Sequence, residues 1–159
     1  MCSETLTVFA LGAAGRREVW HIGTMSSRIS HPTIDSHDAW AQSTGWAQVL
    51  DMGEDPDDPN LSGHEECMIF SADGRSRVLF IEVPEPKQVK NRIHLDLRPT
   101  DRTRDEEIER VLVLGATEMA DTRTPDGPGW TVLADPEGNE LCIARGDLER
   151  VDPDARLNV

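Results

Sequence analysis

Apolar and polar positions alternate in two stretches of the chain, residues 29–36 and 91–97. Alternation of this kind is typical of half-buried strands, whereas apolar residues at intervals of about three or four positions are typical of helices. Helical intervals follow each of these stretches, at 37–50 and at 103–115. The pattern therefore predicts a mixed α+β protein in which each of two strands leads into a helix.

The boundaries of the helices are predicted by individual residues. Thr103 and Glu106 have the spacing of a capping box, and Gly115 supplies a C-terminal stop. The helix predicted at 37–50 is weaker, because Gly45 lies in its interior and glycine is about 1 kcal/mol less favourable there than alanine.

Short apolar runs after each helix predict further strands. Asp73-Gly74 is a hairpin signal between the runs at 66–71 and 77–83. After the second helix, three runs are separated by turns rich in proline and glycine. These three predicted strands are 117–122, 130–134 and 140–145.

The two halves of the chain repeat one another. The segments 31–38 and 94–101 each begin with histidine and have aspartate at the eighth position, and the final apolar runs also correspond. An ordered series of matches indicates a duplicated unit within one compact domain. The predicted divisions are an N-terminal extension (1–28), two modules (29–88 and 89–147) and a C-terminal tail (148–159).

Composition limits the partners and the compartment. The net charge is −14, with 16 basic residues scattered among 30 acidic ones, so neither nucleic acid nor an anionic membrane is an expected partner. The three cysteines, Cys2, Cys67 and Cys142, lie far apart and predict no disulfide framework or structural zinc site. A reducing, cytoplasmic location is expected.

Residues 1–24 match nothing in the duplicated unit. The apolar stretch at 6–14 has no basic residues before it and is too short to span a bilayer, so neither export nor a membrane anchor is expected. The segment is interpreted as a disordered or peripherally packed extension, with an added edge strand at 7–10 as the alternative.

Several segments together resemble the vicinal oxygen chelate superfamily, and most closely its glyoxalase-like domain proteins of the glyoxalase/bleomycin resistance/dioxygenase type. They are His31, 78–87, 90–97, 114–116 and 135–142. The resemblance implies an α+β fold of two tandem βαβββ modules, whose curved mixed sheets enclose a cleft. It also implies a small-molecule ligand, and a cleft formed within one chain or in a dimer; a homodimer is expected.

In metal-using members of this superfamily, the ligands come from the first and last strand of each module. His31 and His94 stand at first-strand positions, and a neutral imidazole suits Zn, Ni, Fe or Mn. Cys142 and Phe80 stand where carboxylates are usual, so Glu82, two residues from Phe80, is the candidate replacement ligand or general base. The alternative is that both histidines are satisfied by backbone carbonyls.

The candidate ligand-binding residues are Thr33, Asp96, Trp130 and Cys142. Asp96 should share a face with His94, where it could orient the imidazole or bind a ligand; a surface role is the alternative. For Trp130 the alternative is core packing, and for Cys142 it is that of a buried, inert thiol.

Two main functions follow from the resemblance. One is binding of a small organic molecule in the cleft between the modules, with metal-dependent lyase, isomerase or dioxygenase chemistry. The other is a metal-free module that binds a small molecule or an antibiotic without catalysis, which the missing carboxylates favour. A protein-interaction domain with a vestigial cleft is a third, weaker alternative.

Overall fold

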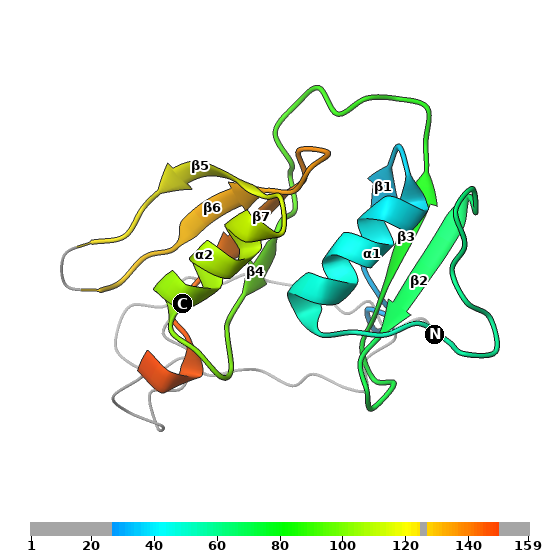
Figure 1. Cartoon of the computed structure of the whole chain (residues 1–159). Coiled ribbons are helices and arrows are strands. Elements are labelled where there is room, and N and C mark those ends of the chain that lie inside the picture. Colours follow the sequence, from blue (N-terminus) through cyan, green and yellow to red (C-terminus); the bar gives the residue numbers. More distant parts are fainter. Residues whose placement is uncertain (1–26, 125–126, 150–159) are drawn as a thin grey trace, which may run out of the picture.

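The computed structural model describes residues 27–124 and 127–149, and it contains two modules (Figure 1). The predictions for the first 26 residues and the last 10 lie outside the described residues, and the exact ends of the modules stay predictions. The first module comprises β1 (Thr33–Ser36), α1 (Ala39–Leu50), β2 (Glu66–Phe70) and β3 (Arg77–Glu82). The second comprises β4 (Leu95–Leu97), α2 (Arg104–Val113), β5 (Thr117–Asp121), β6 (Thr131–Ala134) and β7 (Glu140–Ile143), followed by a short 3-10 turn (Asp147–Glu149).

Each module forms its own mixed sheet, which confirms the α+β class. The strand orders are β1-β3-β2 and β4-β7-β6-β5, and in each sheet the first strand runs parallel to the last. The first module has one strand fewer than the βαβββ pattern. Between α1 and β2 the chain pairs with β2 only at Gly53, opposite Phe70. Pro56 and Pro59 follow, and proline cannot donate to a sheet ladder.

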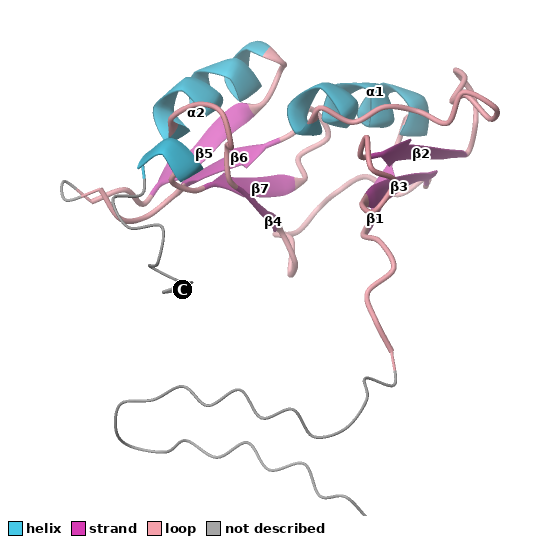
Figure 2. Cartoon of the chain, turned by 90° about the horizontal axis from the view of Figure 1, so that it is seen from below, coloured by secondary structure: helices cyan, strands magenta, loops and turns pink. Residues whose placement is uncertain are grey.

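Both helices lie on the same side of the molecule. Figure 2 shows α1 and α2 above the two sheets, whose opposite faces carry no helix in the described part of the chain. No described helix is long and apolar enough to cross a membrane. We call the uncovered side of each sheet its open face.

The alternation of the strands separates the core from the open faces. Phe80 in β3 and Ile143 in β7 are fully buried and belong to one core cluster, which also contains Trp46 of α1 and Val111 of α2. This cluster takes residues from both modules, so the two sheets share a core on the helix side. Residues that alternate with these along the strands face the other way.

The second module holds α1 at both ends. The Glu137 carboxylate accepts hydrogen bonds from the backbone N–H groups of His37 (2.6 Å) and Asp38 (3.1 Å), next to the start of the helix. At the other end, Arg110 donates to the carbonyls of Gln48 (2.9 Å) and Val49 (2.7 Å). Negative charge at a helix N-terminus and positive charge at its C-terminus both complement the helix dipole. The contacts therefore fix α1 against the second module.

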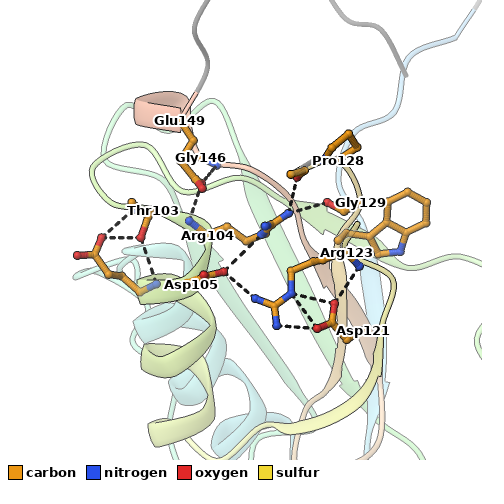
Figure 3. A network of polar contacts seen from close by, with 12 residues as sticks. Thr103, Arg104, Asp105, Asp121, Arg123, Pro128, Gly129, Gly146 and Glu149 are labelled. Carbon is orange, nitrogen blue, oxygen red and sulfur yellow. Dashed lines mark hydrogen bonds and ion pairs between the residues drawn. The ribbon is translucent and has the colours of Figure 1, made fainter. Parts of the chain in front are cut away.

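A polar network ties α2 to the hairpin between β5 and β6 (Figure 3). Thr103 and Glu106 form the predicted capping box. The next residue, Arg104, is 7% exposed, and its guanidinium donates to the carbonyls of Gly127 (3.0 Å) and Gly129 (3.1 Å). A buried guanidinium needs such acceptors, because an unpaired buried charge is costly. The network thus fixes the hairpin relative to the helix.

Asp121 links the same hairpin to Arg123, and we expect this ion pair to make stability depend on pH. Arg123 bonds Asp121 (2.6 Å) and Asp105 (2.7 Å) and lowers the pKa of Asp121 to about 2. A depressed carboxyl pKa stabilises the fold above the unfolded-state value, and that stability is lost as pH falls through the folded-state value. The denaturation midpoints of wild type and Asp121→Asn should therefore differ most at neutral pH and converge as pH falls from about 4 to 2.

Urea denaturation followed by circular dichroism measures this convergence. Asp57→Asn, in the exposed loop after α1, controls for loss of one surface charge. A difference between wild type and Asp121→Asn that stays constant down to the lowest pH would contradict the expectation.

Candidate functional site

His94, Asp96 and Cys142 come together on the open face of the second sheet. The His94 Nδ1 atom lies 3.2 Å from Asp96 Oδ1 and 3.5 Å from Cys142 Sγ. The three ligand atoms all lie within 4.8 Å of one another. Among the described residues, this is the only group of three or more histidine, cysteine, aspartate or glutamate side chains with the spacing of a metal site.

The pairing of β4 with β7 produces this cluster. These strands are parallel, with Leu95 opposite Leu141 and Asp96 opposite Cys142. Leu141 belongs to the core, so its neighbour Cys142 faces the open side with Asp96. His94, immediately before β4, follows the same alternation. One residue of β4, the residue just before β4 and one residue of β7 thus converge.

The three side chains differ in their exposure to solvent. Cys142 is 1% exposed, whereas the side chains of His94 and Asp96 are 38% and 67% exposed. Burial, followed by hydrogen bonding to Asp96 and its negative charge, raises the pKa of the Cys142 thiol to about 11. The thiol is therefore neutral at pH 7 unless a cation at the site stabilises the thiolate.

The donor set fits a divalent metal ion. With ligand bonds of about 2.0–2.3 Å, a tetrahedral site separates a nitrogen from an oxygen by about 3.3 Å and from a sulfur by about 3.6 Å. The distances from His94 Nδ1 to Asp96 Oδ1 (3.2 Å) and to Cys142 Sγ (3.5 Å) match these values. Zn²⁺ binds nitrogen, sulfur and oxygen ligands together, whereas Mn²⁺ favours oxygen. A thiolate in the set therefore favours zinc or iron over manganese.

Glu140 lies beside the cluster but is engaged elsewhere. It is on β7, two residues before Cys142, and its carboxylate is bonded by the Lys90 ammonium and by the Asn91 N–H (3.3 Å). The Lys87 Nζ atom lies 3.8 Å from Glu140 Oε1. The bond from Lys90 is the main cause of a lowered Glu140 pKa. Glu140 is thus a negative charge balanced by two lysines at the edge of the cluster.

The first module supplies a neighbouring pocket rather than further ligands to the cluster. Thr33 and His94 both line a pocket of about 360 Å³ where β1 meets the start of β4. The predicted ligand His31 precedes β1, and its Nδ1 atom lies 3.0 Å from Ser30 Oγ, outside the cluster. Of the two predicted metal-binding histidines, the structure places only His94 in the cluster.

Phe80 and Glu82 occupy the core side of β3. Phe80 is fully buried in the core, and Glu82, two residues on, is at the exposed end of the same row. The structure therefore does not bring Glu82 into the cluster. If His31 matches His94, the sheet register makes Leu79, which pairs with Thr33, the counterpart of Cys142. The internal alignment that chose Phe80 was displaced by one residue, and one residue reverses the face.

The tryptophans divide between core and surface. Trp46 is buried, and its indole N–H donates to Asp135 (3.0 Å). Trp130, the predicted ligand-binding tryptophan, is 48% exposed just before β6 and is not among the residues that line the pocket at Thr33.

Comparison with known sequences identifies the family. The family model described as "Glyoxalase-like domain" matches residues 31–144, which span both modules. The chain belongs to the glyoxalase-like domain family. This confirms the resemblance to the vicinal oxygen chelate superfamily. No curated protein matches the sequence of this glyoxalase-like protein.

Solved structures with the same fold include fosfomycin resistance proteins. A mutant of FosX from Listeria monocytogenes, in complex with Mn(II) and 1S,2S-dihydroxypropylphosphonic acid, has a TM-score of 0.60 and 21% identity, over 79% of this chain and 94% of that one. FosX from Mesorhizobium loti has a TM-score of 0.57 and 21% identity, over 78% and 95%. A glyoxalase/bleomycin resistance protein/dioxygenase family enzyme from Burkholderia phytofirmans PsJN has a TM-score of 0.51 and 22% identity, over 72% and 94%. At this identity the likeness shows the fold alone.

Proposed function

We propose that this glyoxalase-like protein binds a small organic molecule on the open face of its second sheet, at a divalent metal ion held by His94, Asp96 and Cys142. The observation that supports this proposal is the convergence of these three donors within 4.8 Å, with both separations from His94 Nδ1 at the values of a tetrahedral site. The FosX structure with Mn(II) and a small phosphonic acid shows that the fold accommodates a metal and a ligand together.

The three protein ligands would leave one position of a tetrahedral ion open to the small molecule. A divalent ion there supplies Lewis acidity toward ligand oxygen atoms, the chemistry of metal-dependent lyases, isomerases and dioxygenases. The pocket next to His94, lined in part by Thr33, offers space for the rest of the molecule. Lys87 and Lys90 place positive charge nearby, balanced in this structure by Glu140.

The homodimer and the cytoplasmic location expected from the sequence belong to the same proposal. Exposed apolar side chains of Val89, Ile93 and Met119 would gain from contact with a second copy. A reducing compartment would keep Cys142 as a thiol that can bind the ion.

Zinc titration of metal-free protein tests the proposal, and we expect one Zn²⁺ per chain. Competition with a chromogenic chelator gives the affinity, which should fall about 100-fold in His94→Ala, or about 2.7 kcal/mol. The matched control is His64→Ala, an exposed histidine in the loop before β2, which should bind zinc as wild type does. Equal zinc binding by wild type and His94→Ala would contradict the assignment.

Metal-free binding of a small molecule is the second candidate function, and two observations favour it. The raised pKa of Cys142 keeps the thiol neutral without a cation, and His94 already has a hydrogen-bond partner in Asp96. The cluster would then be a polar patch that contacts the ligand directly. Wild-type protein that takes up no zinc would support this candidate instead.

A further inference from the structure

We propose a second binding site on the opposite side of the sheets: a cavity of about 120 Å³ between α1 and the second module, which takes a small neutral aromatic molecule with one hydrogen-bonding group. Its lining comes from α1, from the end of α2 and the turn after it, and from the turn between β6 and β7. Figure 2 shows α1 and α2 on one side of the sheets, whereas the strand alternation places the metal cluster on the opposite, open face. Trp46 lines both this cavity and the pocket beside His94.

The cavity has an apolar floor and a mouth open to solvent. Trp46, Val111 and Leu141 line its inner end and are all buried, whereas Ala41 and Pro136 line it and are exposed. An engineered apolar cavity of about 150 Å³ in another protein binds benzene, so the space here suits a single six-membered ring.

Polar contacts on either side prevent the cavity from closing. Glu137 holds the start of α1 and Arg110 holds its end, with donor–acceptor distances of 2.6–3.1 Å. Between these two anchors, Trp46 is fixed by its hydrogen bond to Asp135. Because these groups are already at hydrogen-bond distance, α1 cannot approach the second module further without overlap of the bonded atoms, so the space between them is part of the fold.

The lining has two carboxylates and no basic side chain, which excludes an anionic ligand. Asp135 accepts hydrogen bonds from the Trp46 indole (3.0 Å) and from the backbone N–H groups of Glu137 (3.0 Å) and Asn139 (2.8 Å). Glu137 is occupied by the start of α1. Both carboxylates therefore have hydrogen-bond partners but keep their negative charge, so an anion would lose hydration and gain no ionic partner, whereas an uncharged ring suits the apolar inner end.

Gln42 supplies the polar group of the site. It lines the cavity and is 4% exposed, and its Nε2 atom has no hydrogen-bond partner in the part of the chain that the structure describes. A buried polar group without a partner costs about 1–3 kcal/mol. Rotation of the terminal amide is soft and can turn either its donor or its acceptor toward the cavity. A ligand hydroxyl can form a hydrogen bond with either group, because it both donates and accepts.

Gly45 leaves one wall of the cavity open. A Cβ atom at this position would meet no other atom within 4 Å, so crowding does not require glycine here. Glycine inside a helix is nevertheless about 1 kcal/mol less stable than alanine. Because Gly45 lines the cavity, it supplies a position at which a larger side chain can fill the space without disturbing the backbone.

Phenol titration followed through the Trp46 indole N–H signal in ¹H–¹⁵N spectra tests the proposal. Comparison with Trp46→Phe assigns the signal. We expect a saturable shift with a Kd in the millimolar range or tighter, weakened at least tenfold in Gly45→Leu, which fills the cavity, and kept in the matched control Gly45→Ala. If Gly45→Leu does not fold, Ala41→Leu at the exposed mouth takes its place.

Two further variants identify the polar contact and the location. Gln42→Leu should weaken phenol about tenfold but leave benzene binding unchanged, and His94→Ala should bind phenol as wild type does. The absence of a saturable shift in wild type up to the solubility of phenol would overturn the proposal. So would equal phenol binding by wild type and both cavity-filling variants, or phenol binding that depends on His94.

Discussion

Replacing Phe80 with glutamate is expected to lower the free energy of unfolding by more than about 4 kcal/mol and to create no metal ligand. Phe80 is fully buried among core residues that include Trp46. The substitution removes this apolar burial, which alone is worth about 3–5 kcal/mol for phenylalanine, and it buries a carboxyl group without a partner. A typical domain has only about 5–15 kcal/mol to lose.

Two control substitutions distinguish the loss of apolar burial at position 80 from the effect of placing a carboxylate in β3. Phe80→Leu keeps an apolar side chain at the same place and should cost clearly less than Phe80→Glu. Leu79→Glu puts the same carboxylate on the open face of the same strand, where Leu79 is only half-buried, and should also cost less. Urea denaturation gives the free energy of unfolding of all three variants. A smaller decrease in that free energy for Phe80→Glu than for Leu79→Glu would reverse the assigned faces of β3.

Replacing Cys142 with serine is expected to lower zinc affinity about 1000-fold, or about 4 kcal/mol. The thiolate is the only sulfur donor of the cluster, and a serine hydroxyl stays neutral at pH 7 and binds zinc poorly. Cys142→Ser is nearly isosteric, so the fold should be retained. Isothermal titration of metal-free protein gives the affinity.

The same position should also set the choice of metal. Cys142→Asp offers an oxygen in place of sulfur, so the preference for Zn²⁺ over Mn²⁺ should narrow relative to wild type. Cys67→Ser, at a buried cysteine in β2 outside the cluster, is the control and should leave the preference unchanged. A Cys142→Ser variant that binds zinc as tightly as wild type would remove the thiolate from the site.

Much of the fold could be predicted from local sequence. The capping box at Thr103 and the turn at Gly74 act within a few residues, so the sequence shows them directly. The helix at Ala39–Leu50 was also predicted, and its N-cap, Asp38, is local, whereas its contacts with Glu137 and Arg110 depend on the second module. The two apolar runs read after the first helix correspond to β2 and β3, whereas the complete βαβββ pattern, which the family resemblance implied, has one strand more than the first module.

The site was predicted less completely, because its geometry depends on pairing between distant strands. His94, Asp96 and Cys142 were each candidates, but in separate roles. Their union requires β4 to pair in parallel with β7 in one register, and that register is set by the apolar residues of the core. The signal was present in the spacing, since His94 and Asp96 lie two residues apart at the start of β4 and therefore face the same side. At Phe80, by contrast, the internal alignment was displaced by one residue and therefore assigned a core position to the ligand-bearing face.

Cobalt substitution is the most direct test of a metal centre at His94, Asp96 and Cys142. Co²⁺ added to metal-free protein should produce the near-ultraviolet absorption of a thiolate-to-cobalt charge transfer, at one equivalent per chain. The absorption should disappear in Cys142→Ser and persist in Cys67→Ser. Wild-type protein that shows no such absorption at saturating Co²⁺, or Cys142→Ser protein that shows it undiminished, would contradict the assignment of this cluster as the metal site.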